Sequence, residues 1–282
     1  MRPSEPKPAH APPPKKSFGQ HFLADPRIAA AIAQLATTPP GGTLLEIGPG
    51  QGALTTHLLP RAGRLVAIER DRDLVPLLGE TFADAIASGQ LTIVEDDAAT
   101  ADWAQLLASG PGPRVVVGNV PYNITGRLLE RAVQIAAHID SVVFMIQKEV
   151  ADRLVAAPDS EHYGALSVFV QAAFSVERAI VVRAGAFRPP PKVDSAVVRL
   201  TARRPPLAEE TPAFRELVRR AFMARRKTLR NAWKGALGLS ASEMAARAAA
   251  AGVSLDARGE TLSVLDFDRV ARGLGGDGET GG

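Results

Sequence analysis

Apolar and polar positions alternate along the first two thirds of the chain in two different rhythms. Short runs of apolar, often β-branched residues are separated by longer stretches in which apolar side chains return at every third or fourth position. The first rhythm predicts strands that are buried on both faces, and the second predicts amphipathic helices. The predicted strands are Thr43–Ile47, Arg64–Ile68, Leu91–Val94, Arg114–Val117 and Ser141–Ile146.

Helices are predicted around these strands. One begins after Asp25-Pro26, because aspartate is a good N-cap and proline suits the first helical turn. The others are Gly52–Leu59, Asp73–Ala87, Thr125–Ala137, Lys148–Ala156 and Ala165–Ala173. This alternation predicts right-handed βαβ units and an α/β fold with a largely parallel, Rossmann-like sheet. Two later strands, Val176–Val182 and Ser195–Leu200, are expected to form an antiparallel edge.

The pattern changes at Arg203–Pro206, which reads as a linker. Helical spacing alone runs from about Thr211 to Arg272, so we expect a small C-terminal all-helical domain. The first sixteen residues are rich in proline and predict a flexible arm. The expected organisation is an arm at 1–16, the α/β domain at 17–203, the helical domain at 207–272 and a disordered tail at 273–282.

Composition narrows the setting of the protein. The 282 residues include no cysteine, which excludes disulfides and thiolate metal sites and favours a reducing compartment. No apolar run is long enough to span a bilayer, and the N-terminus lacks the apolar core of a secretory signal. We therefore expect a cytoplasmic protein without membrane association. The net charge of +3 says little about partners.

A glycine-rich turn follows the first predicted strand of the sheet. Gly48, Gly50 and Gly52 stand between that strand and a helix, where glycine lets the backbone approach a ligand closely. Glu69 ends the next strand, and an acid there accepts hydrogen bonds from ribose hydroxyls in such folds. The third glycine comes one residue too early for a dinucleotide, and Glu46 favours a cationic, phosphate-free ligand such as S-adenosylmethionine. A tight turn without a ligand is the alternative.

Acidic residues also follow the strand that begins at Leu91. Glu95, Asp96 and Asp97 would lie at the carboxyl edge of the sheet, where ligands bind in doubly wound folds. Asp97 is our choice for accepting a hydrogen bond from an adenine amine of the cofactor. Three adjacent acids leave the register open, and each one could instead be a solvated loop charge.

The segment Asn119-Val120-Pro121-Tyr122 carries the most specific local signal. The N6 amine of adenine is a poor nucleophile, so a site that methylates it should accept hydrogen bonds from the amine protons. The Asn119 side-chain oxygen and the Pro121 carbonyl are acceptors of this kind, and Tyr122 offers a face for stacking the base. A turn that only caps a helix is the alternative.

Phe187 lies in a proline-stiffened loop between the two late strands. Such a loop can hold an aromatic ring over a ligand, and Phe187 would then stack on the target base opposite Tyr122. The alternative is an apolar residue that anchors the loop.

The motifs together resemble one known family, the bacterial small-subunit rRNA adenine N6,N6-dimethyltransferases. The resemblance covers about Ser17 to Arg272 and rests on seven segments in order. These are Phe18–Leu23, Leu45–Gly50, Asn119–Ile124, Gln147–Leu154, Tyr163–Ser167, Pro191–Ser195 and Arg225–Asn231.

The resemblance implies a cofactor and a substrate. It implies S-adenosylmethionine as the methyl donor, without a metal, and adds Gln20, His21 and Leu23 to the cofactor-binding set with Gly48, Gly50, Gly52, Glu69, Asp97 and Asn119. It also implies N6,N6-dimethylation of two adjacent adenosines in a terminal hairpin loop of 16S rRNA in the small (30S) ribosomal subunit, late in assembly. We expect a monomer. His21 stands where asparagine is common, and Val120 where leucine is common.

Basic residues crowd between Arg215 and Lys234, with Phe214, Leu217, Val218, Ala221 and Phe222 at the spacing of a buried helix face. The basic side chains would then lie outside, where they can bind phosphates. We expect Arg225, Arg226, Lys227 and Arg230 to bind RNA. A merely solvated face is the alternative.

Other functions share parts of this pattern. A related methyltransferase of the antibiotic-resistance type would act on a 23S rRNA adenine, and a catalytically silent assembly factor would bind RNA without chemistry. A methyltransferase acting on DNA adenine or protein glutamine more often has proline where Val120 stands, and an oxidoreductase would need the dinucleotide spacing.

Overall fold

The computed structural model describes residues 12–15, 18–223 and 226–273. By its contacts the chain divides into two units, one of Met1–Ala151 with Glu177–Thr201 and one of Asp152–Val176 with Ala202–Gly282. The division differs from the predicted boundary, because residues 152–176 join the C-terminal helices rather than the α/β unit. The sequence pattern could not show this, since long-range packing decides it.

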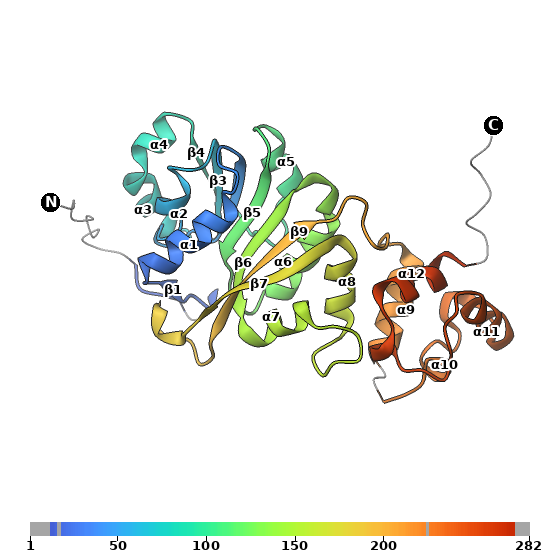
Figure 1. Cartoon of the computed structure of the whole chain (residues 1–282). Helices are drawn as coiled ribbons and strands as arrows, with labels where there is room; N and C mark the ends of the chain where they lie inside the picture. The colour runs from blue at the N-terminus through green and yellow to red at the C-terminus, as the bar shows by residue number, and fades with distance from the viewer. Residues whose placement is uncertain (1–11, 16–17, 224–225, 274–282) are drawn as a thin grey trace, which may run out of the picture. The chain divides into compact units, whose positions relative to one another are not determined.

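A seven-stranded sheet forms the centre of the first unit, in the order β4-β3-β2-β5-β6-β9-β7 (Figure 1). Neighbours from β4 to β6 pair in parallel, and β9 runs antiparallel to β6. The predicted α/β class is therefore confirmed, and the two late strands β9 and β7 lie side by side at one edge of the sheet, as expected. The strands are β2 Thr43–Ile47, β3 Arg64–Glu69, β4 Leu91–Glu95, β5 Arg114–Asn119, β6 Ser141–Gln147, β7 Phe174–Val182 and β9 Ser195–Ala202.

The sheet is covered on both faces. Leu65 of β3 and Val115 of β5 lie in one apolar cluster with Ile32 of α1. The next residue of each strand, Val66 and Val116, points to the opposite face of the sheet and is fully buried there. This explains why the strands read as continuous apolar runs. The helices of this part are α1 Pro26–Ala36, α2 Thr55–Leu58, α3 Leu74–Thr81, α4 Ala83–Ala87, α5 Trp103–Ala108, α6 Thr125–Gln134, η2 Ala136–His138, α7 Lys148–Val155 and η3 Ala184–Ala186.

Helix ends follow local chemistry where a cap is present. The Asp25 side chain accepts a hydrogen bond from the Arg27 N–H, so α1 begins as predicted at Pro26. The helix expected over Asp73–Ala87 is interrupted at Phe82, which separates α3 from α4. Phe82 closes on Gly52, where an added Cβ would lie 2.5 Å from its ring.

Two short strands join distant segments of the first unit. Strand β1, Phe22–Leu23, pairs antiparallel with β8, Phe187–Arg188. This pairing ties the segment before α1 to the loop that precedes β9. The local sequence pattern did not predict it, because each strand has only two residues.

The second unit is built around an apolar core of its own. Trp233 is fully buried, donates from its indole N–H to the Leu217 carbonyl at 2.9 Å, and packs edge-on against Phe267. Tyr163, from the segment Asp152–Val176 of this unit, packs its ring into the same core, and its hydroxyl donates to the Leu262 carbonyl. The helices are α8 Ala165–Ala173, α9 Pro212–Met223, α10 Leu229–Ala232, η4 Ala236–Gly238, α11 Ala241–Ala250, η5 Gly259–Thr261 and α12 Val264–Arg272.

Helix α9 buries the predicted face, with Phe214, Leu217, Val218 and Ala221 inside.

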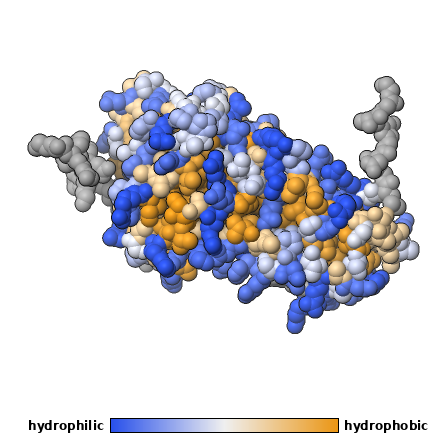
Figure 2. Space-filling view, viewed as in Figure 1, coloured by the Kyte–Doolittle hydropathy of each residue, from blue (hydrophilic) through white to orange (hydrophobic). Residues whose placement is uncertain are grey.

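On the view in Figure 2, hydrophilic residues separate the patches of apolar surface. Within the ranges described above, none of the helices has the length and apolarity needed to cross a membrane.

Candidate functional site

A pocket opens at the carboxyl edge of the sheet, around the strands where the chain order reverses. Strand β2 lies between β3 and β5, so the loops after these strands diverge there, as at the ligand site of doubly wound folds. The lining includes most of the predicted residues, namely Gln20, His21, Leu23, Gly48, Gly50, Glu69, Asp97, Asn119, Pro121 and Tyr122. Gly52 and Phe187 are not part of it.

The glycines of the turn after β2 differ in what surrounds them: one borders open space, and the others lie against an aromatic ring. Gly48 and Gly50 have φ of +65° and +61°, a left-handed conformation that favours glycine. A Cβ at Gly48 would meet no protein atom within 4 Å, whereas a Cβ at Gly50 would lie 3.1 Å from the Phe22 ring. Gly52 does not line the pocket, and a Cβ there would lie 2.5 Å from the Phe82 ring, so packing accounts for this glycine and its part in cofactor binding stays a prediction.

Two buried acids lie beside this turn and are held differently. Glu69 accepts hydrogen bonds from the N–H groups of Gly50 at 3.0 Å and Asp71 at 2.8 Å, and burial raises its pKa. Glu46 accepts from the Thr55 hydroxyl at 2.8 Å, and burial raises its pKa to about 8. Because Glu46 lines the pocket and its burial disfavours the charged form, a cation placed there would favour its ionisation.

Asp97 lies at the pocket wall beyond β4. One of its carboxylate oxygens accepts from the Ala99 N–H at 2.9 Å, and the other pairs with the Arg70 guanidinium at 3.3 Å. Asp96 turns its carboxylate back to the Asp97 N–H. Both Asp96 and Asp97 line the pocket, so the choice of Asp97 as the acid that faces a ligand stays a prediction. Arg70 is a lining residue that sequence reasoning missed, and no local pattern signalled it.

The segment 18–23, here called the strap, forms one wall of the pocket. Gln20 lines the pocket, and both ends of its side-chain amide have protein partners, because the amide nitrogen donates to Asp71 at 2.9 Å and the oxygen accepts from the Lys15 N–H. Leu23 is buried in the core of the α/β unit. Lys15, near the end of the predicted arm, thus contacts Gln20 and Asp71, while residues 1–11 and 16 of that arm lie outside the described residues.

Asn119 ends β5 and points into the pocket region with a fixed orientation. Its side-chain nitrogen donates to the backbone carbonyl of His21 at 2.9 Å. Since a carbonyl can only accept, this bond assigns the amide nitrogen to the strap and leaves the Asn119 oxygen free to accept a hydrogen bond.

The Pro121 carbonyl does not have the free lone pairs that its predicted role requires. It accepts from the Ile124 N–H at 3.2 Å and from the Thr125 hydroxyl at 3.1 Å, bonds that start α6. Both acceptor positions of a carbonyl oxygen are then used. Val120 also lines the pocket, and no group in the described part of the chain donates to its carbonyl. Val120 is therefore the better backbone acceptor, one residue before the predicted one.

Tyr122 lies beside an aromatic neighbour that was expected only to bind the cofactor. The His21 ring stacks on Tyr122 with centroids 5.8 Å apart and an interplanar angle of 25°. The His21 Nδ1 lies 2.8 Å from the Pro189 carbonyl and must donate to it, while the Tyr122 hydroxyl bonds to Ser195. Burial raises the pKa of Tyr122. The Tyr122 ring is thus held by the stacked His21 ring and by the hydrogen bond of its hydroxyl to Ser195.

Phe187 does not line the pocket. The side chain is 1% exposed and belongs to the same apolar cluster as Leu23, its partner in the β1–β8 pair. This burial favours the alternative interpretation, a residue that anchors the loop, and the stacking of Phe187 on the target base stays a prediction. The β1–β8 pairing turns the side chain inward.

The basic residues expected to bind RNA lie in the helical unit. Arg226, Lys227 and Arg230 are exposed, and Arg230 pairs with Asp256 at 2.9 Å. Arg225 lies outside the described residues. In the parts of the chain described, no three His, Asp or Glu side chains cluster as metal ligands would; the expectation of no metal stays a prediction.

Comparison with known proteins agrees with this geometry. The family model for ribosomal RNA adenine dimethylase matches residues 13–271. A protein named ribosomal RNA small subunit methyltransferase A from Anaeromyxobacter sp. (strain K) is 45% identical over 272 residues, 93% of each chain. Its namesake from Xanthomonas campestris pv. campestris (strain B100) is 48% identical over 261 residues, 92% of this chain and 95% of the other.

Two solved structures match most of the chain. A dimethyladenosine transferase from Plasmodium falciparum has a TM-score of 0.73 at 25% identity and covers 89% of this chain and 96% of its own. The 23S rRNA methyltransferase ErmE has a TM-score of 0.65 at 27% identity and covers 89% and 98%. With the family match spanning nearly all the described residues, the chain belongs to the ribosomal RNA adenine dimethylase family.

Proposed function

We propose that this chain transfers methyl groups from S-adenosylmethionine to the N6 atoms of adenines in small-subunit rRNA. The observation that carries the proposal is the Asn119 side chain, whose nitrogen is bound by the His21 carbonyl and whose oxygen is left free at the pocket. Family membership and relatives 45–48% identical, named as small-subunit methyltransferases, support the substrate class.

The pocket fits S-adenosylmethionine, which supplies a methyl group on a sulfonium and also carries an ammonium. Glu46 is a buried acid that such a cation would ionise, and the Gly48 turn leaves space beside the backbone. Glu69 is placed to accept from ribose hydroxyls, and Asp97 to accept from the adenine amine of the cofactor. His21, Leu23 and Gly50 complete the wall.

Catalysis depends on acceptors that are set before the substrate arrives. The lone pair of N6 is delocalised into the adenine ring, so positive charge builds on nitrogen as its bond to the methyl carbon forms. The Asn119 oxygen and the Val120 carbonyl accept from the two amine protons and stabilise this charge. Bound S-adenosylmethionine would supply the methyl group and keep the electron pair of its broken carbon–sulfur bond, and N6 would release one proton to solvent. A second cycle adds the second methyl group.

Tyr122 and His21 hold the base in place. The face of Tyr122 away from His21 can stack on an adenine that is turned out of the RNA, which is the usual way to expose a base for chemistry. Positioning of this kind lowers the entropic cost of reaction without a covalent intermediate.

We propose that the substrate is a pair of adjacent adenosines in a terminal hairpin loop of 16S rRNA, methylated late in assembly of the 30S subunit. Arg226, Lys227 and Arg230 would contact RNA phosphates, together with Arg225 outside the described residues. Such a substrate places the protein in the cytoplasm, where it would act as a monomer.

One experiment separates this function from its alternatives. Unmethylated 30S subunits and, in parallel, 50S subunits are incubated with labelled S-adenosylmethionine, and the modified nucleotides are mapped. We expect two neighbouring dimethyladenosines in 16S rRNA only. Label in 23S rRNA would instead indicate the function named for ErmE, which is 27% identical to this chain. Cofactor and subunit binding without label would indicate a silent assembly factor.

A further inference from the structure

The strap, residues 18–23, contributes to two parts of the proposed function at once. Its residues form a wall of the cofactor pocket, and the His21 carbonyl holds the Asn119 amide. A displacement of the strap would therefore open the cofactor site and free the Asn119 side chain to rotate. What holds the strap in place then matters for both binding and chemistry.

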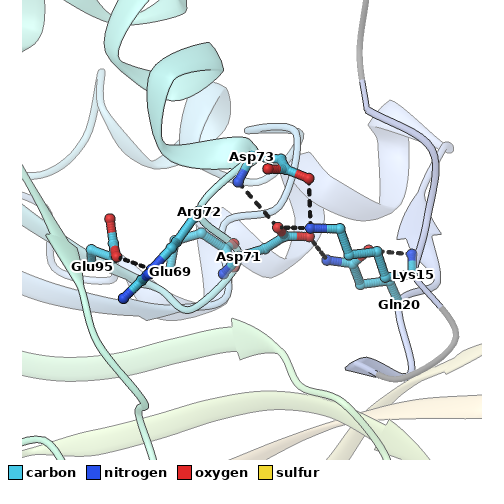
Figure 3. A network of polar contacts seen from close by, with 7 residues as sticks. All are labelled: Lys15, Gln20, Glu69, Asp71, Arg72, Asp73 and Glu95. Carbon is cyan, nitrogen blue, oxygen red and sulfur yellow. Dashed lines mark hydrogen bonds and ion pairs between the residues drawn. The ribbon is translucent and has the colours of Figure 1, made fainter.

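Asp71 is the residue on which the contacts of the strap converge (Figure 3). It follows β3, and its side chain is only 2% exposed. The carboxylate accepts from the Lys15 ammonium, from the Gln20 amide at 2.9 Å and from the Asp73 N–H at 3.1 Å. Burial opposes its ionisation, but the bonds from Lys15 and Gln20 outweigh this and keep the pKa of Asp71 below its ordinary value.

Lys15 makes the cluster a clamp across the base of the strap. Its ammonium pairs with Asp73 at 2.7 Å as well as with Asp71, and lies 5.6 Å from the centre of the Phe18 ring. Arg70 lies over the same ring at 5.5 Å. The strap is thus held by charge and by its aromatic residue at the point where it enters the pocket.

The backbone of Asp71 extends the connection to the ribose-binding acid. Its N–H donates to Glu69, whose second oxygen accepts from Gly50 at 3.0 Å. One residue therefore fixes the strap through its side chain and Glu69 through its backbone.

We propose that Asp71 is a positioning residue, which with Lys15 clamps the strap over the cofactor pocket and thereby keeps Asn119 oriented. The inference rests on the proposed function for its catalytic consequence, but the clamp itself is a property of the chain without substrate. A residue that only stabilised its loop would affect unfolding alone.

Three variants of the full chain test the clamp. Asp71→Asn keeps the shape and removes the charge, Lys15→Met removes the ammonium, and Lys15→Arg keeps a cation as the rescue. The matched control is Glu95→Gln, which removes an exposed ion pair to Arg72 at 2.7 Å in the same region without touching the strap. The unfolding transition of each protein is measured first, and all variants are compared at a temperature at which every one of them is fully folded.

The first measurement is amide hydrogen exchange of residues 18–23 in the cofactor-free protein. The second is the dissociation rate of S-adenosylhomocysteine. We expect Asp71→Asn and Lys15→Met to raise both rates about tenfold, as for loss of a charged hydrogen bond, while Lys15→Arg and Glu95→Gln stay within about twofold. With RNA substrate, the first two variants should also lower kcat, because Asn119 loses its fixed partner.

The outcomes separate the clamp from the proposed function. Unchanged exchange in Asp71→Asn and Lys15→Met would overturn the clamp, whatever the activity. Faster exchange with unchanged kcat would overturn the link to Asn119. If the wild-type protein failed to methylate 30S subunits, the proposed function would fall, while the exchange data would still decide the clamp.

Discussion

The pocket of the α/β unit and the basic surface of the helical unit hold their charged groups in opposite ways. In the pocket, Glu69 is 5% exposed and its oxygens accept from backbone N–H groups. On the helical unit, Arg226 and Lys227 are exposed, and the pair between Arg230 and Asp256 has side chains 58% and 75% exposed. The first arrangement fixes geometry, whereas the second supplies charge without fixing it.

This difference predicts where a single substitution should have a large effect on function. A buried group that is held by several bonds cannot be replaced without leaving a partner unsatisfied. An exposed cation in water contributes about 1 kcal/mol or less and is screened by salt. A single substitution in the pocket should therefore cause a large loss of activity. Each substitution on the basic surface should lower RNA affinity by a small amount, and these amounts should add.

The largest effect is expected at Asn119. Asn119→Ala removes the free oxygen that accepts from N6, so we expect the rate of methyl transfer to fall by about 10²–10³-fold. Single-turnover methylation of 30S subunits measures this rate. Binding of S-adenosylhomocysteine, followed by calorimetry, should change much less. A rate near that of the wild type would remove Asn119 from the mechanism.

The second effect concerns Glu46 and its proton. The pKa of Glu46 is about 8 in the folded chain against an ordinary 4.5, so between these values the folded protein holds a proton that the unfolded chain has released. The stability from this group is fully present below about pH 4.5 and is lost as pH rises through about 8. Glu46→Gln should flatten this slope in chemical unfolding of the cofactor-free protein, whereas Glu80→Gln, at an exposed position of α3, should not.

The same proton gives a test of the cationic ligand. If S-adenosylmethionine ionises Glu46, binding at pH 7 should release about one proton, and Glu46→Gln should release none. Calorimetry in buffers of different ionisation enthalpy counts the proton. Equal release by both proteins would place the titrating group elsewhere in the pocket.

A smaller effect is expected on the basic surface. Reversing Arg226 and Lys227 to Glu should weaken binding of small-subunit rRNA and leave cofactor affinity unchanged, because both side chains are exposed and lie outside the pocket. Replacing Lys227 alone with Ala should lower the slope of log affinity against log salt by about one. Unchanged RNA affinity in a salt-controlled assay would contradict the assignment of this surface.

The smallest effect is expected at Arg230. Its guanidinium is already paired with Asp256, so Arg230→Ala should weaken RNA binding less than Lys227→Ala does. Asp256→Asn provides the control, since it frees Arg230 and should strengthen RNA binding slightly, by about twofold at most. The same titrations measure both variants, and a loss at Arg230 larger than at Lys227 would show that the pair with Asp256 opens when RNA binds.

Local patterns predicted the elements that local chemistry determines. The strands were found within one or two residues, and their true ends take in Glu69 and Asn119 because pairing with the neighbouring strand continues to those residues. The acids and the amide at the carboxyl edge could therefore be placed from sequence. The Asp25 cap fixed the start of α1 in the same way.

Contacts between distant segments explain what the sequence missed. Phe187 is buried because β8 pairs with β1, more than 160 residues earlier, and Gly52 is constrained by Phe82 across a loop. The Pro121 carbonyl is used by the start of α6, a detail of turn geometry that spacing does not show. Lys15 and Asp71 are 56 residues apart, so no local pattern could pair them.

The bond from Asn119 to residue 21 has a consequence for how this protein can vary between species. The acceptor is a main-chain oxygen, which every amino acid possesses, so the identity of the side chain at position 21 can drift without disturbing the amide. A histidine can replace the commoner asparagine for this reason. Inserting or deleting a single residue between Phe18 and Leu23 would instead shift that oxygen, so we expect this stretch to tolerate substitutions better than changes of length.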